Sequence, residues 1–278
     1  MTRLVKLQKL QKLLILLTLS LLSAQSSWAA AIEHGGWDRL LKANVRVIDG
    51  GQATQLDYAG MAQQHAPLNA YLQRLSKVSR AEFDQWPHPE QLAFLINAYN
   101  AWTVELILRA WPDIESIKEQ GSLFSSPWSK AFIPLLGETL SLDEVEHNLI
   151  RGSGRYQEPR IHFAVNCASI GCPALRAEAY RGATLDAQLE AQTRLFLADR
   201  SRNRLRDGEL QLSAIFDWYG EDFASGWQGT ASLAQFLGRY ADALGLSAFE
   251  QQQLLAGQLD VAFLDYDWRL NATVRAVN

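Results

Sequence analysis

Residues 90–111 read EQLAFLINAYNAWTVELILRAW, a mostly apolar stretch that follows a break at Pro87 and Pro89. Its apolar side chains largely recur every three or four residues, which predicts one long helix ended by Pro112. Because few of its positions are polar, we expect this helix at the centre of the fold. Asn97 and Asn100 lie three residues apart on it, and buried amides need hydrogen-bond partners. These two amides should hold a loop backbone or orient a catalytic histidine.

Shorter elements are predicted on both sides of this helix. A short helix, an extended segment at residues 45–48 and a second helix precede it. Ser141 and Glu144 form a capping box, which predicts that a helix begins at about residue 142. Residues 160–167 alternate between apolar and polar, which is typical of a strand, and Asp207-Gly208 predicts a hairpin over residues 205–210. Further helices are expected after Thr184, Ser213, Ser232 and Ser247.

These elements predict an α+β fold, a mainly helical single domain over residues 30–278 with a small antiparallel sheet. No linker, repeat or low-complexity tract divides this part of the sequence. With cysteine and histidine on separate elements, the domain would loosely resemble papain and transglutaminase, by analogy of fold alone.

Composition excludes several classes of protein. The chain has 278 residues, of which 48% are hydrophobic, so it can bury a core and is not disordered. Its formal net charge of −4 offers no basic face for nucleic acid. No glycine-rich phosphate loop is present in the context of a strand and a helix. We therefore expect a small-molecule or peptide-like substrate, no nucleic-acid partner and no cofactor.

Residues 1–29 have the pattern of a secretory signal peptide. Basic residues precede an apolar run over 13–22, and Ser27-Trp28-Ala29 supplies small residues at the cleavage positions before Ala30. The run is shorter than the roughly 20 residues that a membrane-spanning helix needs. We expect cleavage, a periplasmic or secreted product without a stable membrane anchor, and a compartment where cysteines can be oxidised.

Both cysteines of the chain lie in HFAVNCASIGCP, residues 162–173, where the predicted strand ends. Pro173 favours the first position of a helix, which would make Cys172 its N-cap and place free amides near a sulfur, lowering its pKa. Three states are open: a structural Cys167–Cys172 disulfide, a reactive or redox-regulated thiol, and two inert buried thiols.

Five histidines could act as the base for such a thiol. His34, His65 and His88 have polar or proline-flanked surroundings and are expected at the surface. In a regular strand His162 points away from Cys167, because an odd separation reverses the face. His147, three residues after Glu144 on the capped helix, is therefore the preferred base, and His162 is the alternative.

Possible metal ligands and clusters of aromatic residues are the remaining features. Glu144 and His147 have the spacing of a di-iron ligand pair, but no second pair is present, and the cysteine spacing permits zinc without requiring it. No metal is expected. Aromatic residues that could line a cleft or pack in the core are Trp102, Trp111, Trp128, Trp218, Tyr219 and Trp227. Predicted binding residues are Asn100, Trp102, Ser169 and Cys172.

Four ordered blocks resemble the domain of unknown function 547 family. They are FLINAYNA at 94–101, SLDEVEH at 141–147, the segment 160–173 and FDWY followed by Asp222-Phe223 at 216–223. The resemblance spans about residues 40–270. It implies kinship with exported bacterial proteins and with plant proteins that carry a leucine zipper, which is absent here, and it implies no settled activity. The residues that members share match Asn97, Asn100, Glu144, His147, His162, Cys167, Ser169 and Cys172.

The leading hypothesis is a thiol-dependent hydrolase or acyl-transfer enzyme. Cys167 would attack a carbonyl, His147 or His162 would accept its proton, and Asn97 or Glu144 would fix the imidazole tautomer. Backbone amides of the turn 168–172 would bind the oxyanion, and Cys172 would be a resolving or structural partner. The alternative is a non-catalytic binding module, in which a Cys167–Cys172 disulfide and an aromatic cleft shape a peptide or glycan pocket. A disulfide exchanger is disfavoured because the chain has no Cys-x-x-Cys motif.

Overall fold

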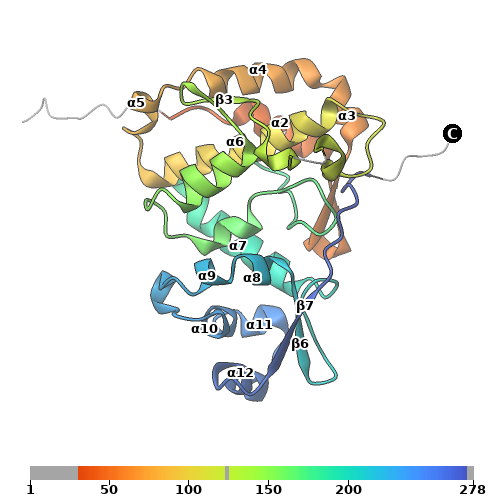
Figure 1. The fold of residues 1–278 in the computed structure, drawn as a ribbon, viewed down its shortest axis with the longest axis vertical. Helices are drawn as coiled ribbons and strands as arrows, with labels where there is room; N and C mark the ends of the chain where they lie inside the picture. Colours follow the sequence, from red (N-terminus) through yellow and green to blue (C-terminus); the bar gives the residue numbers. More distant parts are fainter. Residues whose placement is uncertain (1–30, 123–124, 274–278) are drawn as a thin grey trace, which may run out of the picture. The chain divides into compact units, whose positions relative to one another are not determined.

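The computed structural model describes residues 31–122 and 125–273. The chain from Ala31 onward forms one compact unit, whereas the predicted signal peptide lies outside the described residues. The fold is α+β and mainly helical, as predicted (Figure 1). No helix of the described residues is long and apolar enough to cross a membrane.

The long helix predicted at residues 90–111 is α6, His88–Leu108. Its residues from Gln91 to Ile107 are all buried, which confirms its central place. α4 packs on it in the upper part of Figure 1, α2 packs on α4, and the segment around residues 142–151 packs on α6 as well. The α-helices are α2 Gly35–Asn44, α3 Tyr58–Gln63, α4 His65–Ser76, α5 Arg80–Phe83, α6, α7 Leu185–Ala198, α8 Ile215–Trp218, α9 Gly220–Phe223, α10 Leu233–Gly238, α11 Ala241–Leu244 and α12 Ala248–Leu255.

Short 3₁₀ helices and a π-helix connect these elements. The 3₁₀ helices are η1 Asp49–Gly51, η2 Ile117–Gln120, η3 Pro127–Ser129, η5 Pro159–Phe163, η6 Gly182–Thr184 and η7 Trp227–Gly229. The predicted capping box is present: the Glu144 amide donates to Ser141 Oγ at 3.1 Å and the Ser141 amide to Glu144 Oε2 at 2.7 Å. Helical backbone begins at residue 142, as predicted, and widens into the π-helix η4, Glu144–Arg151.

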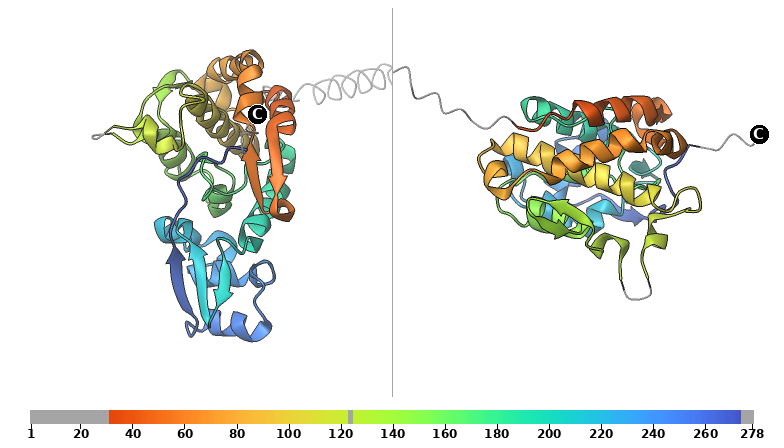
Figure 2. Two further views of the ribbon diagram at one scale, coloured as in Figure 1. Left: turned by 90° about the vertical axis from the view of Figure 1, so that its right-hand side faces the viewer. Right: turned by 90° about the horizontal axis from the view of Figure 1, so that it is seen from above.

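Seven short strands form three small sheets in the described residues. They are β1 Val45–Ile48, β2 Ala53–Leu56, β3 Ile133–Leu135, β4 Glu138–Leu140, β5 Arg204–Arg206, β6 Glu209–Ser213 and β7 Asp260–Leu264. β1–β2, β3–β4 and β5–β6 are antiparallel, and β7 joins β6 in parallel (Figure 2). The predicted hairpin is β5–β6, and its turn residues Asp207 and Gly208 have φ of 54° and 84°, as a primed turn requires.

The strand predicted at residues 160–167 is wrong. Residues 159–163 form the 3₁₀ helix η5, and an irregular loop follows. All residues from 159 to 166 are buried, so the alternation of polar and apolar side chains does not separate a solvent face from a core face. The predicted helix after Pro173 is also absent, since residues 173–181 are irregular and Cys172 is therefore no N-cap.

A cluster of buried hydrophobic side chains, most of them from the C-terminal part of the chain, holds η5 in place. Phe163 is fully buried and lies within 4.9 to 6.3 Å, ring centroid to centroid, of four phenylalanines. These are Phe196, Phe216, Phe223 and Phe236. The aromatic contacts fix η5, and with it the neighbouring His162 and the loop that carries the cysteines.

Candidate functional site

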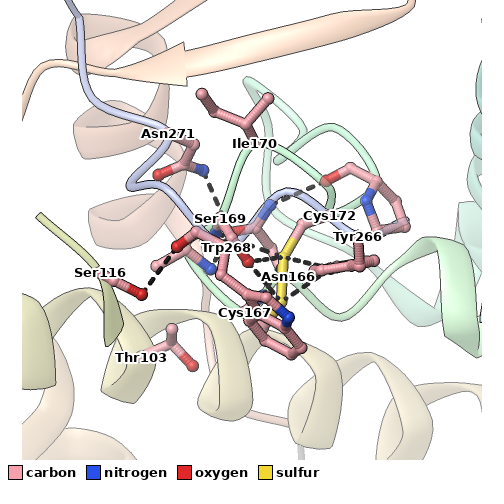
Figure 3. The surroundings of a disulfide bond; sticks show 12 residues. Thr103, Ser116, Asn166, Cys167, Ser169, Ile170, Cys172, Tyr266, Trp268 and Asn271 are labelled. Atoms are coloured by element: carbon pink, nitrogen blue, oxygen red, sulfur yellow. Dashed lines mark hydrogen bonds between the residues drawn. A yellow bond between two sulfur atoms is a disulfide. The ribbon is translucent and has the colours of Figure 1, made fainter. Parts of the chain in front are cut away.

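The two cysteines are joined in a Cys167–Cys172 disulfide (Figure 3). Of the three states that the sequence left open, the structure contains the disulfide, and neither cysteine is free. Cys172 is only 2% exposed, whereas Cys167 is half-buried and lines a cavity. Cys167 is therefore the sulfur that a molecule in the cavity can reach.

Two asparagines shape the loop that carries the disulfide. The Asn100 side chain donates to the Ala164 carbonyl at 3.0 Å and accepts from the Asn166 amide at 2.8 Å. Asn166 in turn donates to the Pro173 carbonyl at 2.8 Å and accepts from the Ala168 amide at 3.0 Å. Asn100 is thus a scaffold of the cysteine loop rather than a ligand-binding residue.

A segment near the C-terminus, residues 266–271, lies against the same loop (Figure 3). The Ile170 amide donates to the Arg269 carbonyl and the Gly171 amide to the Asp267 carbonyl, both at 2.8 Å. The Asn271 amide donates to the Ala168 carbonyl at 3.0 Å. These bonds bring Tyr266 and Trp268 to the cysteines across about a hundred residues of sequence.

Gly171 is where this segment approaches most closely, and Gly171→Ala tests the contact. A Cβ there would lie 2.8 Å from Cε1 of the Tyr266 ring, so the ring or the loop must shift. We expect a loss of about 1–3 kcal/mol in the free energy of unfolding, measured with chemical denaturant. Gly220→Ala is the control, because a Cβ at Gly220 meets nothing within 4 Å. Equal effects of the two substitutions would contradict the packing described.

The disulfide sulfurs differ in their hydrogen bonds. Cys172 Sγ accepts from the Cys167 amide at 3.0 Å, the Ser169 amide at 3.4 Å and the Tyr266 hydroxyl at 3.3 Å. Cys167 Sγ lies 3.2 Å from both the Ser169 and the Tyr266 hydroxyls. Ser169 thus contacts the sulfurs, but it is only 1% exposed and does not line the cavity.

The amides of the turn 168–172 are not free to bind an oxyanion, which corrects the sequence-based hypothesis. Besides the amides already described, the Cys172 amide donates to the Ser169 carbonyl at 3.1 Å. Each amide of this turn therefore has a partner, because the loop is closed by its own backbone and by residues 266–271.

A cavity of about 270 Å³ opens beside Cys167. Fourteen of the residues that the structure describes line it, and most of them are aromatic, acidic or histidine. They are Tyr99, Trp128, Asp143, Glu146, His147, His162, Val165, Cys167, Pro173, Ile215, Trp218, Tyr219, Tyr266 and Trp268. The cavity thus brings together side chains from six separate segments of the sequence.

His162 is held in one orientation at this cavity. Its Nε2–H donates to Asp222 Oδ2 at 2.7 Å, and its ring stacks on Tyr219 with centroids 3.9 Å apart. Nδ1 is buried without a hydrogen-bond partner and lies 4.0 Å from Glu146 Oε1. Because Nε2 carries the hydrogen, Nδ1 is left with a free lone pair, which is the state of a general base.

The burial of His162 favours its neutral imidazole. Burial lowers the pKa of His162, against the opposite effect of Asp222 and Glu146. Partial burial would raise the pKa of Asp222, but hydrogen bonds from His162 and Arg151 outweigh it and hold that pKa well below its usual range. Arg151 Nε donates to Asp222 Oδ2 at 2.6 Å and Nη2 to Oδ1 at 3.1 Å. Asp222 is therefore a fixed carboxylate that can stabilise an imidazolium.

His147 lines the cavity but is poorly arranged as the base, contrary to the sequence-based preference. Arg151 Nη1 donates to His147 Nδ1 at 2.8 Å, which occupies the lone pair that would accept a proton. Nε2 then carries the hydrogen and lies 3.7 Å from Asp143 Oδ1. The preference for His147 assumed a regular strand at His162, and that strand is not formed.

Asn97 and Glu144 do not orient either imidazole. Asn97 is fully buried and holds the Tyr180 backbone, donating to its carbonyl at 2.8 Å and accepting from its amide at 3.0 Å. The Glu144 carboxylate is used in the capping box. Asp222 and Arg151 hold the two histidines instead, so the predicted positioning roles of Asn97 and Glu144 are not supported.

The predicted aromatic residues separate into two groups. Trp128, Trp218 and Tyr219 line the cavity. Trp102 does not: it is 6% exposed and packs edge-on against Phe132. Trp111 lies against Tyr58 and Trp227 against Phe236. The first group belongs to the site, and the second belongs to the core and its edges.

His65 and His88 are exposed, as predicted, but His34 is not. His34 is 4% exposed, with its Nδ1 2.7 Å from the Tyr71 hydroxyl. His34 has polar neighbours in the sequence, but α2 and α4 bury it in the fold. Burial, aided by Arg181 and Arg74, lowers its pKa to about 4.

This lowered pKa predicts a loss of stability on acidification. Between pH 6.5 and pH 4 the unfolded chain binds a proton at His34 that the folded chain does not, so stability falls as the pH falls through that window. From pH 7 to pH 5 the contribution is about 2 kcal/mol. In His34→Gln, the fall in unfolding free energy over this range should be smaller by that amount. Identical pH dependence in the two proteins would contradict the burial of a neutral His34.

Sequence reasoning missed five residues of the site. Glu146, Arg151, Asp222, Tyr266 and Trp268 received no role. Asp222 could have been found, because it lies in the FDWY block that carried the family resemblance. Nothing local marks Tyr266 and Trp268, since their place depends on the long-range contact with the cysteine loop.

Residues 83–197 match the family described as Protein of unknown function, DUF547. The chain carries a DUF547 domain. The matched segment contains both cysteines and both histidines of the cavity, and Asp222, Tyr266 and Trp268 lie outside it. Neither a curated protein nor a solved structure matches the chain. Within the described residues, no group of three or more His, Cys, Asp or Glu side chains could hold a metal ion.

Proposed function

We propose that this DUF547 protein is a thiol-dependent acyl-transfer enzyme or hydrolase, with Cys167 as its nucleophile once the disulfide is reduced. One observation carries the proposal. His162 donates through Nε2 to a fixed Asp222 carboxylate, and its unpartnered Nδ1 belongs to a residue that lines the same cavity as Cys167. A nucleophile, a base and a group that orients the base are the parts that such catalysis requires.

Reduction by a small thiol would release the nucleophile. The incoming thiolate attacks Cys167 Sγ, the half-buried sulfur that lines the cavity, and forms a mixed disulfide with it. Cys172 leaves as a thiolate, which the Cys167 and Ser169 amides and the Tyr266 hydroxyl stabilise. A second thiol then attacks the sulfur of the first, and Cys167 is released reduced.

The acyl-transfer step follows from the same contacts. Cys167 gives its proton to His162 Nδ1, and the thiolate attacks the carbonyl carbon of the substrate. Tyr266, whose hydroxyl lies 3.2 Å from Cys167 Sγ, is the donor best placed for the oxyanion, and burial raises its pKa so that it keeps its proton. The imidazolium protonates the leaving group, and water or another acceptor then releases the acyl group from Cys167.

Export of the protein is part of the proposal. The signal-peptide pattern of residues 1–29 and the Cys167–Cys172 disulfide both support a periplasmic or extracellular place, where disulfides persist. An oxidising compartment would keep the enzyme in its inactive disulfide form until a thiol reductant reaches it.

A second candidate is the non-catalytic binding module. The formed disulfide and the aromatic lining of the cavity favour it, because both are compatible with a rigid pocket that performs no chemistry. The two candidates differ in whether Cys167 ever carries an acyl group.

Trapping of an acyl-enzyme distinguishes them. The protein is reduced with a dithiol, freed of reductant, mixed with p-nitrophenyl acetate at pH 7 and examined by peptide mass mapping. The proposal predicts acetyl on Cys167 and a burst of p-nitrophenol, both lost in Cys167→Ser and in the oxidised protein, and both kept in Cys172→Ser. Acetylation that is absent, or equal on the two cysteines, would overturn the proposal and favour the binding module.

A further inference from the structure

Four of the aromatic rings that line the cavity form one cluster. They are Trp128, Trp218, Tyr266 and Trp268. Trp268 lies at the centre of this cluster. Its ring centroid is 5.4 Å from that of Trp128, 5.8 Å from that of Trp218 and 4.5 Å from that of Tyr266. Trp218 is 47% exposed, so this cluster is not simply core packing. Rings from three separate segments present their faces and edges around one hollow.

The charged side chains that line the cavity are all acidic. Asp143 and Glu146 contribute carboxylates, and no lysine or arginine belongs to the lining among the described residues. The His162 imidazole, whose Nε2 carries the hydrogen, is neutral. Burial, and the nearby Glu146 and Glu144 carboxylates, raise the pKa of Asp143 against the opposing effect of His147. A bound cation would relieve this crowding of negative charge.

Two rings of the cavity lining already contact cations of the chain itself. Lys118 Nζ lies 4.1 Å from the centroid of Trp268, and the Arg151 guanidinium carbon lies 4.7 Å from that of Tyr219. Both distances are within the range of a cation–π interaction. The unpartnered Nδ1 of His162, whose side chain is 1% exposed, adds a free acceptor beside Glu146. Ring faces, carboxylates and a free acceptor all favour a positively charged group.

We propose that this cavity binds a substituted ammonium group carried by a small molecule. The inference deepens the proposed function, on which it rests for the view that the bound molecule is an acyl substrate: the cation would be held by Trp268 and its neighbours while its acyl carbon faces Cys167. A volume of about 270 Å³ suits a single such group, since pockets for drug-sized ligands are typically larger. Aromatic rings with nearby carboxylates are the usual way in which proteins recognise quaternary ammonium ions.

Choline and its uncharged isostere, 3,3-dimethylbutan-1-ol, test the inference by isothermal titration calorimetry. The oxidised protein is used, in which Cys167 cannot react, so a failure to bind is separate from a failure of the acyl-enzyme test. We expect choline to bind with a dissociation constant at least tenfold below that of the alcohol. Equal affinity for the two compounds, or no binding of choline at millimolar concentration, would overturn the inference.

Variants locate the binding. Trp268→Leu removes the central ring, and Glu146→Gln keeps the shape of the side chain but removes its charge. Each substitution should weaken choline binding at least tenfold. Glu146→Gln should change the affinity for the uncharged alcohol less than it changes the affinity for choline. Phe249→Leu is the control, because Phe249 is 67% exposed on α12 and outside the cavity. Unchanged choline affinity in Glu146→Gln, whose fold is checked by circular dichroism, would also count against the site.

Discussion

Asp222→Asn is expected to slow the alkylation of Cys167 in the reduced protein by at least about tenfold at pH 6. The asparagine amide would face His162 Nε2, where the carboxylate now accepts a hydrogen bond at 2.7 Å. An amide N–H at that place favours the tautomer with hydrogen on Nδ1, so the nitrogen that should accept the thiol proton is no longer a base. Loss of a general base typically costs a factor of about 10² to 10⁴.

The experiment uses Cys172→Ser as background, so that Cys167 stays reduced and is the only thiol. Iodoacetamide labelling is followed by mass spectrometry. In a His162→Ala background, Asp222→Asn should have no further effect, because Asp222 acts through the imidazole. Asp242→Asn is the matched control: this aspartate also pairs with an arginine, Arg194, at 2.8 Å, but it is far more exposed than Asp222. Equal alkylation rates in Asp222→Asn and Asp242→Asn would contradict the role given to Asp222.

Asn100→Ala is expected to lower the free energy of unfolding by about 2–5 kcal/mol. It leaves the Ala164 carbonyl and the Asn166 amide unpaired in a buried place, and an unsatisfied buried group costs about 1–3 kcal/mol. Because these hydrogen bonds hold the cysteine loop, we also expect a changed rate of alkylation of Cys167 in the reduced protein. Thermal and denaturant unfolding measure the first effect, and the labelling assay measures the second.

Asn97→Ala is the control for this prediction. Asn97 also lies on α6 and also pairs with a backbone carbonyl and amide, those of Tyr180. It should cost a similar free energy of unfolding without changing the alkylation rate once the protein is folded. If both variants altered the alkylation rate equally, the link between Asn100 and the cysteine loop would be wrong.

Local signals in the sequence predicted much of the fold. The capping box at Ser141, the helix after Ser247, the Asp207-Gly208 turn and the apolar periodicity of α6 each depend on residues that are close in sequence, and each is present. The segment at 160–167 could not be predicted in this way. The Ala164 carbonyl and the Asn166 amide bond to the Asn100 side chain, and residues 160–166 are all buried, so tertiary contacts override the alternating pattern.

The site shows the same division between local and long-range information. Cys167, His147 and His162 were recognised from their residue types and their place in the sequence, and they do line one cavity. The choice between the two histidines could not be made from sequence, because it depends on Arg151 and Asp222, which approach through the fold. Burial of His34 was missed for a similar reason, since α4 supplies its partner Tyr71.

The pKa of the Cys167 thiol, measured by thiolate absorbance at 240 nm in Cys172→Ser, is the most direct test of the Cys167–His162 pair. An unperturbed thiol titrates near pH 8.5, whereas a thiolate stabilised by an imidazolium has a pKa below about 7. We predict a pKa below 7 that returns toward 8.5 in His162→Ala. Titration near pH 8.5 in both proteins would show that His162 does not activate Cys167.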